Sequence, residues 1–175
     1  PKIMGPQSQA IKSLKSQKIN MLHLVPKKPF WENDGMSPNM YTDQLAGMIL
    51  SQRQASSPEK VDSLTVWLRG PIAERLDRMD QDEAIASVIQ SIEDLRPSAK
   101  GQLEVAAYHS WFLNPYSKGD WAYWGPGQIK EFGREISKPH HRLHFCGEHT
   151  AIANRGMEGA LESGERVFFE ILDLG

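Results

Sequence analysis

The chain has 175 residues, of which 39% are hydrophobic and 24% charged, and its 20 basic and 22 acidic side chains leave a net charge of −2. This composition is that of a globular polypeptide about one domain in length, and it gives no electrostatic reason to expect binding to nucleic acid or to an anionic membrane. The longest apolar run is far shorter than the roughly 20 residues that a membrane span needs.

Three short apolar segments in the first two thirds of the chain predict strands, over residues 19–25, 64–68 and 105–111. Prolines stop the first segment and a glycine ends the second. Residues 32–62 contain clusters of Gly, Pro, Asn and Ser around a short apolar piece, so we expect this stretch to be mostly irregular.

Two helices are predicted between the second and third strands, over residues 71–79 and 81–95, because apolar side chains recur there at helical spacing. Asp80 is a candidate N-cap of the second helix, with Glu83 three residues later as in a capping box. Pro97 should end that helix.

The last thirty residues predict a strand, a loop and a helix. An apolar strand over residues 144–146 ends at Gly147-Glu148, and a helix opens at Gly156. The first turn of a helix has unpaired N–H donors and the positive end of the helix dipole, so it can stabilise negative charge on a ligand. Gly156 lacks a Cβ, which would let a flat ring approach the backbone.

The same helix has apolar residues at helical spacing, which predicts one buried face. These residues are Met157, Leu161, Phe168, Ile171 and Leu172, with small Ala160 and Gly164 between them. Glu162 is expected on the opposite, solvated face, where its replacement by alanine should have little effect.

Four short segments carry a resemblance to a known family. They are Pro29-Phe30-Trp31, Asn114-Pro115-Tyr116-Ser117-Lys118-Gly119, Phe145-Cys146-Gly147-Glu148 and Met157-Glu158-Gly159-Ala160. Their order and types resemble the flavin amine oxidases, the family of monoamine oxidases, polyamine oxidases and L-amino-acid oxidases. In that family the last two segments form the carboxyl-terminal FAD-binding stretch.

The resemblance implies an α/β (α+β) fold. Residues 1–113 would be part of a mixed-sheet substrate-binding domain with helices, and residues 114–175 the carboxyl-terminal segment of a Rossmann-like FAD-binding domain. Such enzymes begin with a Gly-x-Gly-x-x-Gly turn at the FAD pyrophosphate, and this sequence contains none. We therefore expect the chain to be a fragment or subunit that packs on an amino-terminal polypeptide of the same oxidase, and we expect an oligomer.

The implied activity is the FAD-dependent oxidative deamination of an amine. A hydride passes from the substrate Cα to flavin N5, and oxygen then reoxidises the flavin, so that the products are an imine or 2-oxo acid, ammonia and hydrogen peroxide. An L-amino acid is the substrate that we favour. The alternatives are a monoamine or polyamine oxidase, and a non-catalytic relative that serves as an interaction subunit.

The resemblance also places the candidate site residues. Trp121 corresponds to one wall of the aromatic slot that holds the substrate in monoamine oxidases, and Gly156 to the opposite wall, where those enzymes have tyrosine; we assign both to catalysis. The residues expected to contact FAD are Trp124, Gly147, Glu148, Gly156 and Met157. No metal site is expected.

Three residues bear on where the chain departs from the family. Asp120 occupies the position at which some monoamine oxidases have the cysteine that bonds to the flavin; since a carboxylate cannot form that thioether, FAD should be bound non-covalently. Met21 occupies the strand position usually held by a lysine near flavin N5. Lys18 could replace that lysine only if a bulge shifted the register.

The remaining histidines and the cysteine give weaker signals. His149 could donate a hydrogen bond to the flavin or have a structural role. His140 and His141 are expected at the surface, without the further ligands that a metal would need. His109 favours a core position. Cys146 is the only cysteine, so no disulfide can form within the chain, and we favour a packed thiol over a reactive one. The first residues lack the features of a signal peptide, which leaves the compartment open.

Overall fold

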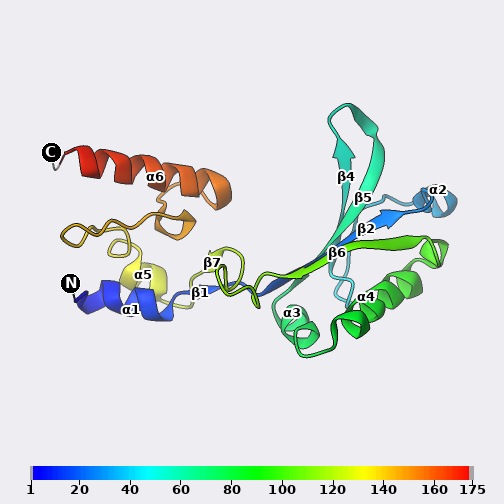
Figure 1. Cartoon of the computed structure of the whole chain (residues 1–175), viewed down its shortest axis with the longest axis horizontal. Helices are drawn as coiled ribbons and strands as arrows, with labels where there is room; N and C mark the ends of the chain where they lie inside the picture. Colours follow the sequence, from blue (N-terminus) through cyan, green and yellow to red (C-terminus); the bar gives the residue numbers. More distant parts are fainter. Residues whose placement is uncertain (1, 174–175) are drawn as a thin grey trace. The chain divides into compact units, whose positions relative to one another are not determined.

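The computed structural model describes residues 2–173, which form two compact units (Figure 1). One unit runs from Lys18 to Asp120, and the other combines the residues up to Gln17 with those from Trp121 onward. The assignment of residues 1–113 and 114–175 to a substrate domain and an FAD domain stays a prediction. No helix in the described part of the chain is long and apolar enough to cross a membrane.

The unit from Lys18 to Asp120 is built on a five-stranded sheet in the order β3-β4-β5-β2-β6. The strands are β2 (Ile19–Pro26), β3 (Met40–Tyr41), β4 (Met48–Gln54), β5 (Ser57–Arg69) and β6 (Leu103–Ser110). Every pair among them is antiparallel, so the part of the predicted mixed sheet that this chain supplies is an antiparallel one. The three predicted strands are confirmed as β2, the second half of β5 and β6.

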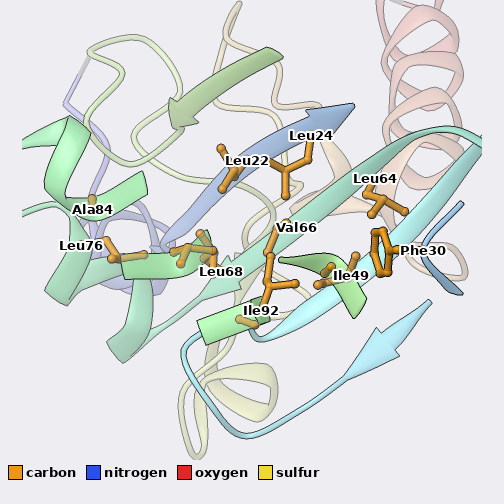
Figure 2. Close-up of a cluster of buried hydrophobic side chains, with 13 residues drawn as sticks. Leu22, Leu24, Phe30, Ile49, Leu64, Val66, Leu68, Leu76, Ala84 and Ile92 are labelled. Atoms are coloured by element: carbon orange, nitrogen blue, oxygen red, sulfur yellow. The ribbon is translucent and has the colours of Figure 1, made fainter. Parts of the chain in front are cut away.

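Two helices cover one face of this sheet and form its core. They are α3 (Pro71–Leu76) and α4 (Gln81–Leu95). The buried cluster, drawn in Figure 2, includes Leu22, Leu24, Val66 and Leu68 from the two central strands and Ala84, Val88 and Ile92 from α4. Each fully buried side chain of the size of leucine contributes roughly 1.5–3 kcal/mol relative to an exposed one. This core joins the two helices to the sheet.

The predicted start of α4 is confirmed. The Asp80 carboxylate accepts the backbone N–H groups of Asp82 at 2.9 Å and Glu83 at 3.5 Å, which satisfies two of the unpaired donors of the first turn. Pro97 begins a short 3-10 helix, η1 (Pro97–Ala99), and so ends α4 as expected.

The prediction that residues 32–62 are mostly irregular is wrong. They contain most of a short helix, α2 (Trp31–Asp34), as well as β3, β4 and the first half of β5. β4 and β5 form a hairpin that extends beyond the rest of the sheet (Figure 1), and Gln54 pairs with Ser57 at its tip. Because neither face of the outer hairpin is buried, its sequence lacks the alternation of apolar and polar residues that reveals a strand.

A buried ion pair attaches α2 to the end of α4. Arg96, whose side chain is 5% exposed, donates to both carboxylate oxygens of Asp34 at 2.7–3.1 Å and to the carbonyl of Ser37 at 2.7 Å. The Ser98 hydroxyl also donates to Asp34. The hydrogen bond from Arg96 has the largest effect on the pKa of Asp34 and that from Ser98 the next largest. Together they lower this pKa to about 2.

The second unit contains little regular sheet. Its elements are α1 (Gly5–Ser13), the two-stranded β1 (Lys15–Ser16) and β7 (Ala122–Tyr123), α5 (Gln128–Phe132), η2 (Glu148–Thr150) and α6 (Gly156–Leu172). Its small core consists of Ala10, Phe132 and Ile136, with Leu14 and Trp124 packed against it.

The strand predicted over residues 144–146 is not formed. Residues 144–146 have no strand pairing, and the isolated bridge between His140 and Leu143 lies just before them. A strand needs a partner for its backbone donors and acceptors, and none of the described residues pairs with this segment. For the same reason Cys146 is exposed rather than packed, contrary to expectation.

The helix predicted from Gly156 is confirmed as α6, but its apolar face is not buried. Met157 is 85% exposed and Leu161 69%, and Phe168, Ile171 and Leu172 are each more than half exposed. The residues of α6 that are buried are small, Gly159 and Ser163. The apolar spacing therefore predicted the helix correctly, but the polypeptide that would cover this face is not among the described residues.

Candidate functional site

A hollow of about 560 Å³ lies within the second unit, between the segment at β7 and the start of α6. Its lining residues are Trp121, Ala122, Tyr123, Trp124, Ile129, Glu148, Arg155 and Gly156. Four residues predicted to form the site, Trp121, Trp124, Glu148 and Gly156, are thus brought together from segments distant in sequence.

Three aromatic residues, Trp121, Tyr123 and Trp124, form one wall of the hollow, called the aromatic wall below. It is held by β1 and by the small core. Lys15 pairs with Tyr123 in the β1–β7 ladder, and the Gln17 N–H donates to the Trp121 carbonyl at 2.9 Å. Trp124 packs against the core of Phe132 and Ile136. One end of this wall is therefore fixed by backbone hydrogen bonds and the other by apolar packing.

Glu148 joins the aromatic wall to the loop that precedes α6. Its Oε1 accepts the Ala122 N–H at 2.6 Å, whereas its Oε2 is buried without a hydrogen-bond partner among the described residues. A buried carboxylate oxygen without a donor is costly, so this atom favours a ligand that brings one.

The turn before Glu148 requires glycine. Gly147 has φ = 125°, and a Cβ there would lie 2.6 Å from the His149 ring. The Gly147 N–H donates to the Ser163 hydroxyl of α6 at 2.8 Å. Gly147 thus positions Glu148 without lining the hollow itself, and the half-buried His149 packs against this turn.

The start of α6 is open on the side of the hollow. Gly156 has φ = 62°, and a Cβ built on it would meet no atom within 4 Å. No described residue accepts the N–H groups of Met157 and Glu158, and Arg155 at the N-cap position gives no side-chain cap. These unpaired donors are what the sequence predicted for an anion cradle. The Met157 side chain itself is exposed and does not line the hollow.

The sequence suggested that Glu162 lies on a solvated face and can be replaced with little effect. The structure instead shows that its side chain has several hydrogen-bond partners. Its carboxylate accepts the N–H groups of Ile152, Ala153 and Asn154 at 2.7–3.3 Å and the Asn154 side-chain amide at 3.0 Å. These hydrogen bonds, above all the one from Ile152, lower the pKa of Glu162. Glu162 therefore shapes the loop that leads into Gly156.

Arg166 is a second positioning residue that sequence reasoning missed. It donates to the carbonyls of Phe145 at 2.7 Å and Ser137 at 3.3 Å, to the Thr150 hydroxyl at 3.3 Å, and to Glu170. The only signal in the sequence was its place on α6, one turn after Glu162. Its five donors let one side chain connect α6 to the segment before the site.

Burial alone would raise the pKa of Glu170, but its contacts with His144, at 3.0 Å, and with Arg166 outweigh burial and lower it. The Glu170 carboxylate thus joins His144 and Arg166 in one network. This network holds the segment that carries Gly147 and Glu148 against α6.

The sheet unit holds the residues near the expected lysine position. Met21 lies between Trp67 and His109 on neighbouring strands, and its sulfur accepts the Trp111 indole N–H at 3.2 Å. The register of β2 shifts between His23 and Leu24 but not between residues 19 and 21. That Met21 occupies the lysine position stays a prediction.

Lys18 does not reach that register. Its ammonium lies 3.2 Å from Glu74 and 4.4 Å from the centre of the Phe112 ring. Lys18 could take the place of the expected lysine only if a bulge shifted the register of β2. The strand pairs from Ile19 to His23 contain no such bulge.

His109 is exposed, not a core histidine as expected, and its ring stacks edge-on against Trp111 with 4.5 Å between ring centres. His141 is exposed and His140 half-buried, and their rings lie against each other. Within residues 2–173, no group of three or more His, Cys, Asp or Glu side chains could hold a metal ion.

Comparison with known proteins agrees with this description. The family described as flavin containing amine oxidoreductase matches residues 1–168. The chain is 23% identical over 170 residues to the L-amino-acid oxidase BmooLAAO-I of Bothrops moojeni, and 28% identical over 183 residues to the flavin-containing amine oxidase A of Equus caballus. These alignments cover 95% and 99% of this chain but 34% of each relative, so the chain spans about a third of their length.

Among solved structures, wild-type putrescine oxidase bound to putrescine matches 99% of this chain and 39% of its own, with a TM-score of 0.82 and 19% sequence identity. This likeness concerns the fold, and it confirms the predicted α/β class. Because the family match extends over nearly the whole sequence, the predictions of the family and of FAD as its cofactor are also confirmed: the chain belongs to the flavin-containing amine oxidoreductases.

Proposed function

We propose that this chain is part of an FAD-dependent oxidase that oxidatively deaminates an amine, with an L-amino acid as the favoured substrate. The observation that carries the proposal is the hollow itself, where Trp121, Glu148 and the start of α6 meet. Amine oxidation is the activity named for the family and for the relatives, and the finer choice of substrate is ours.

The residues of the hollow fit FAD. The open space at Gly156 and the aromatic rings opposite suit a flat ring system, and the unpaired N–H groups at Met157 and Glu158 suit its electron-rich pyrimidine edge. The unpartnered Oε2 of Glu148 suits a hydroxyl donor. We assign cofactor binding to these residues, with Trp124 and Gly147 supporting them. When bound, FAD supplies the acceptor for the substrate hydride, and oxygen removes the electrons as hydrogen peroxide.

The chain's own residues would orient the substrate and stabilise charge. Trp121 would form the wall against which the substrate lies, and so set the angle at which the Cα–H bond is presented. The positive end of α6 would stabilise the negative charge that develops at the pyrimidine edge. Asp120 cannot form a thioether, so we propose that FAD is held without a covalent bond.

The second polypeptide of the site is also a proposal. The sequence has no Gly-x-Gly-x-x-Gly turn for the pyrophosphate, it spans about a third of its relatives, and α6 leaves its apolar face exposed. Soluble monomers rarely expose an apolar patch of several large side chains. An amino-terminal polypeptide of the same oxidase that carries this turn would supply both missing parts, and the assembly would form an oligomer.

The test is a panel of amines and amino acids given to the complete FAD-loaded protein, with hydrogen peroxide as the readout. The proposal expects peroxide with L-amino acids, whereas a preference for simple amines or diamines would favour a monoamine or polyamine oxidase. Met21, at the expected lysine position, favours the second candidate, a non-catalytic interaction subunit. That candidate predicts an assembly that yields no peroxide with any of the compounds.

A further inference from the structure

A second hollow, of about 360 Å³, lies within the sheet unit, where the end of α3 meets β6 and the loop that follows β6. It shares no lining residue with the hollow between Trp121 and Gly156. Its lining includes the apolar side chains of Leu76, Met79, Leu113 and Pro115 and the polar ones of Asp77 and Tyr108. It is called the Asp77 hollow below, and the proposed oxidase chemistry uses none of its residues.

Two of these lining residues belong to a buried polar cluster. The side-chain amide of Asn20, a fully buried residue, donates to the Asp77 carboxylate at 3.0 Å and to the Tyr108 hydroxyl at 2.7 Å. Two oxygens of the cluster, Oδ1 of Asn20 and Oδ2 of Asp77, are buried and have no hydrogen-bond partner among the described residues. A buried acceptor without a donor is costly, so the cluster favours a ligand that supplies donors.

The negative charge of Asp77 has no partner in the described part of the chain. Lys18 and Arg78 both contact Glu74 instead, at 3.2 Å and 2.9 Å. Burial raises the pKa of Tyr108 and the charge of Asp77 acts in the same direction, so the hydroxyl keeps its proton. Asp77 is the only acidic residue that lines its hollow, and no lysine or arginine lines it. A cation in the hollow would therefore be stabilised.

The lining favours an organic cation over a metal ion. A metal ion needs several ligands around it, and no group of three or more His, Cys, Asp or Glu side chains in residues 2–173 could hold one. A primary ammonium has three N–H donors, as many as the cluster with its unpartnered oxygens could use. The apolar side chains of Leu76, Met79 and Leu113 suit the hydrocarbon part of such a molecule.

We propose that the Asp77 hollow binds a small primary amine in its ammonium form, with the ammonium group at Asp77 and the hydrocarbon part against Leu76, Met79 and Leu113. The inference does not depend on the proposed function, because the hollow consists of residues of the sheet unit alone and binding there involves no transfer of electrons. It adds a binding site for amines that is separate from the hollow assigned to FAD.

The probe for this site is tert-butylamine, which has no hydrogen on the carbon next to nitrogen and so cannot pass a hydride from that carbon to the flavin. Isothermal titration calorimetry of the complete holoprotein gives its Kd. Asp77→Asn removes the charge but keeps an oxygen that can accept from Asn20. It should raise the Kd at least about tenfold, because a hydrogen bond to a charged group is lost.

Asp43→Asn is the matched control, since Asp43 is an exposed aspartate of the same unit outside the Asp77 hollow, and its Kd should stay within about twofold of the wild-type value. A second comparison needs no variant. tert-Butanol has nearly the shape of the probe but no charge, so it should bind the wild type at least about tenfold more weakly than tert-butylamine.

Equal Kd values in wild type and Asp77→Asn, or equal binding of the amine and the alcohol, would overturn the proposal. Absence of tert-butylamine binding to the wild type would overturn it as well, and would mean that water alone satisfies the cluster. Each of these results leaves the oxidase function in place. If no amine reduces the flavin, the proposed function fails instead, and binding of tert-butylamine that depends on Asp77 would still support this site.

Discussion

Trp121 and Gly156 line the same hollow from segments far apart in the sequence, and the proposed chemistry depends on both. The family resemblance led us to expect these two residues on opposite sides of one site. What could not be foreseen is how they are held: Glu162 and Arg166 act through the loop and the segment before the site, and a lone carboxylate or guanidinium on a helix gives no sequence signal for such contacts. Glu148 lines the hollow, and its contact with FAD stays a prediction. The exposure of Cys146 and His109 depends on what packs around them and was predicted wrongly.

Replacing Trp121 with alanine should slow flavin reduction more than it weakens FAD binding. A misplacement of the substrate by about 1 Å costs on the order of 100-fold in rate, so a loss of that size is expected. Anaerobic stopped-flow absorbance with a saturating L-amino acid measures it. Tyr41→Ala, which removes an aromatic side chain that is 71% exposed and outside the hollow, is the control and should reduce at the wild-type rate. Equal rates in wild type and Trp121→Ala would remove Trp121 from the site.

Gly156 tests whether the start of α6 contacts the flavin. Alanine and valine at φ = 62° both carry the strain of the left-handed region, about 1–2 kcal/mol, and only valine adds branched bulk toward the hollow. We therefore expect flavin content to fall in the order wild type, Gly156→Ala, Gly156→Val, measured by absorbance after gel filtration. Glu165→Ala, an exposed residue of α6 for which no contact is described, should retain its flavin. Full flavin content and turnover in Gly156→Val would mean that the helix start lies elsewhere.

At the scale of elements, helices with strong apolar periodicity and a cap were predictable, and segments whose partners lie elsewhere were not. α4 has an apolar stripe, the Asp80 cap and Pro97, and all three signals agree. The outer part of the β4–β5 hairpin, residues 51–61, has no buried residue, so no alternation of apolar and polar side chains marked it in the sequence. The 144–146 segment shows the reverse case, an apolar sequence that forms no strand without a neighbour to pair with.

The ion pair between Asp34 and Arg96 should make the attachment of α2 sensitive to acid. The pKa of Asp34 is lowered from 3.8 to about 2, so the carboxylate stabilises the fold above pH about 4, and this contribution is lost as the pH falls toward 2. Thermal unfolding of wild type and Asp34→Asn at several pH values measures it. The wild type should be the more stable at pH 6, and the difference should shrink between pH 4 and pH 2. A difference that is independent of pH would show that the charge of Asp34 contributes nothing.

At the scale of the whole molecule, the exposed apolar side chains along α6 and the lack of a dinucleotide-binding turn in the sequence both favour association with a second polypeptide. The described residues form the hollow but do not cover the apolar face of α6, and the sequence has no Gly-x-Gly-x-x-Gly turn. The predicted burial of the apolar face of α6 is not observed, because a pattern of apolar residues indicates which face is covered but not which polypeptide covers it.

Association with an amino-terminal polypeptide of the same oxidase is therefore expected. Co-expression of the two should give a complex that is stable in gel filtration and carries FAD, and Leu161→Asp with Phe168→Asp on the exposed face of α6 should prevent it, since each buries a charge. Arg142→Glu, which reverses an exposed charge outside α6, is the control and should leave the complex intact. A well-behaved monomer of this chain that binds FAD unaided would contradict this prediction.

Anaerobic bleaching of the flavin in the complete protein tests whether it is an oxidase. An L-amino acid mixed with the oxidised holoprotein in the stopped-flow instrument should remove the yellow absorption band in a single turnover, because the substrate hydride reduces the flavin, and admission of oxygen should restore the band with release of hydrogen peroxide. Retention of the oxidised spectrum with every amine and amino acid tested would contradict the oxidase assignment and favour a non-catalytic subunit.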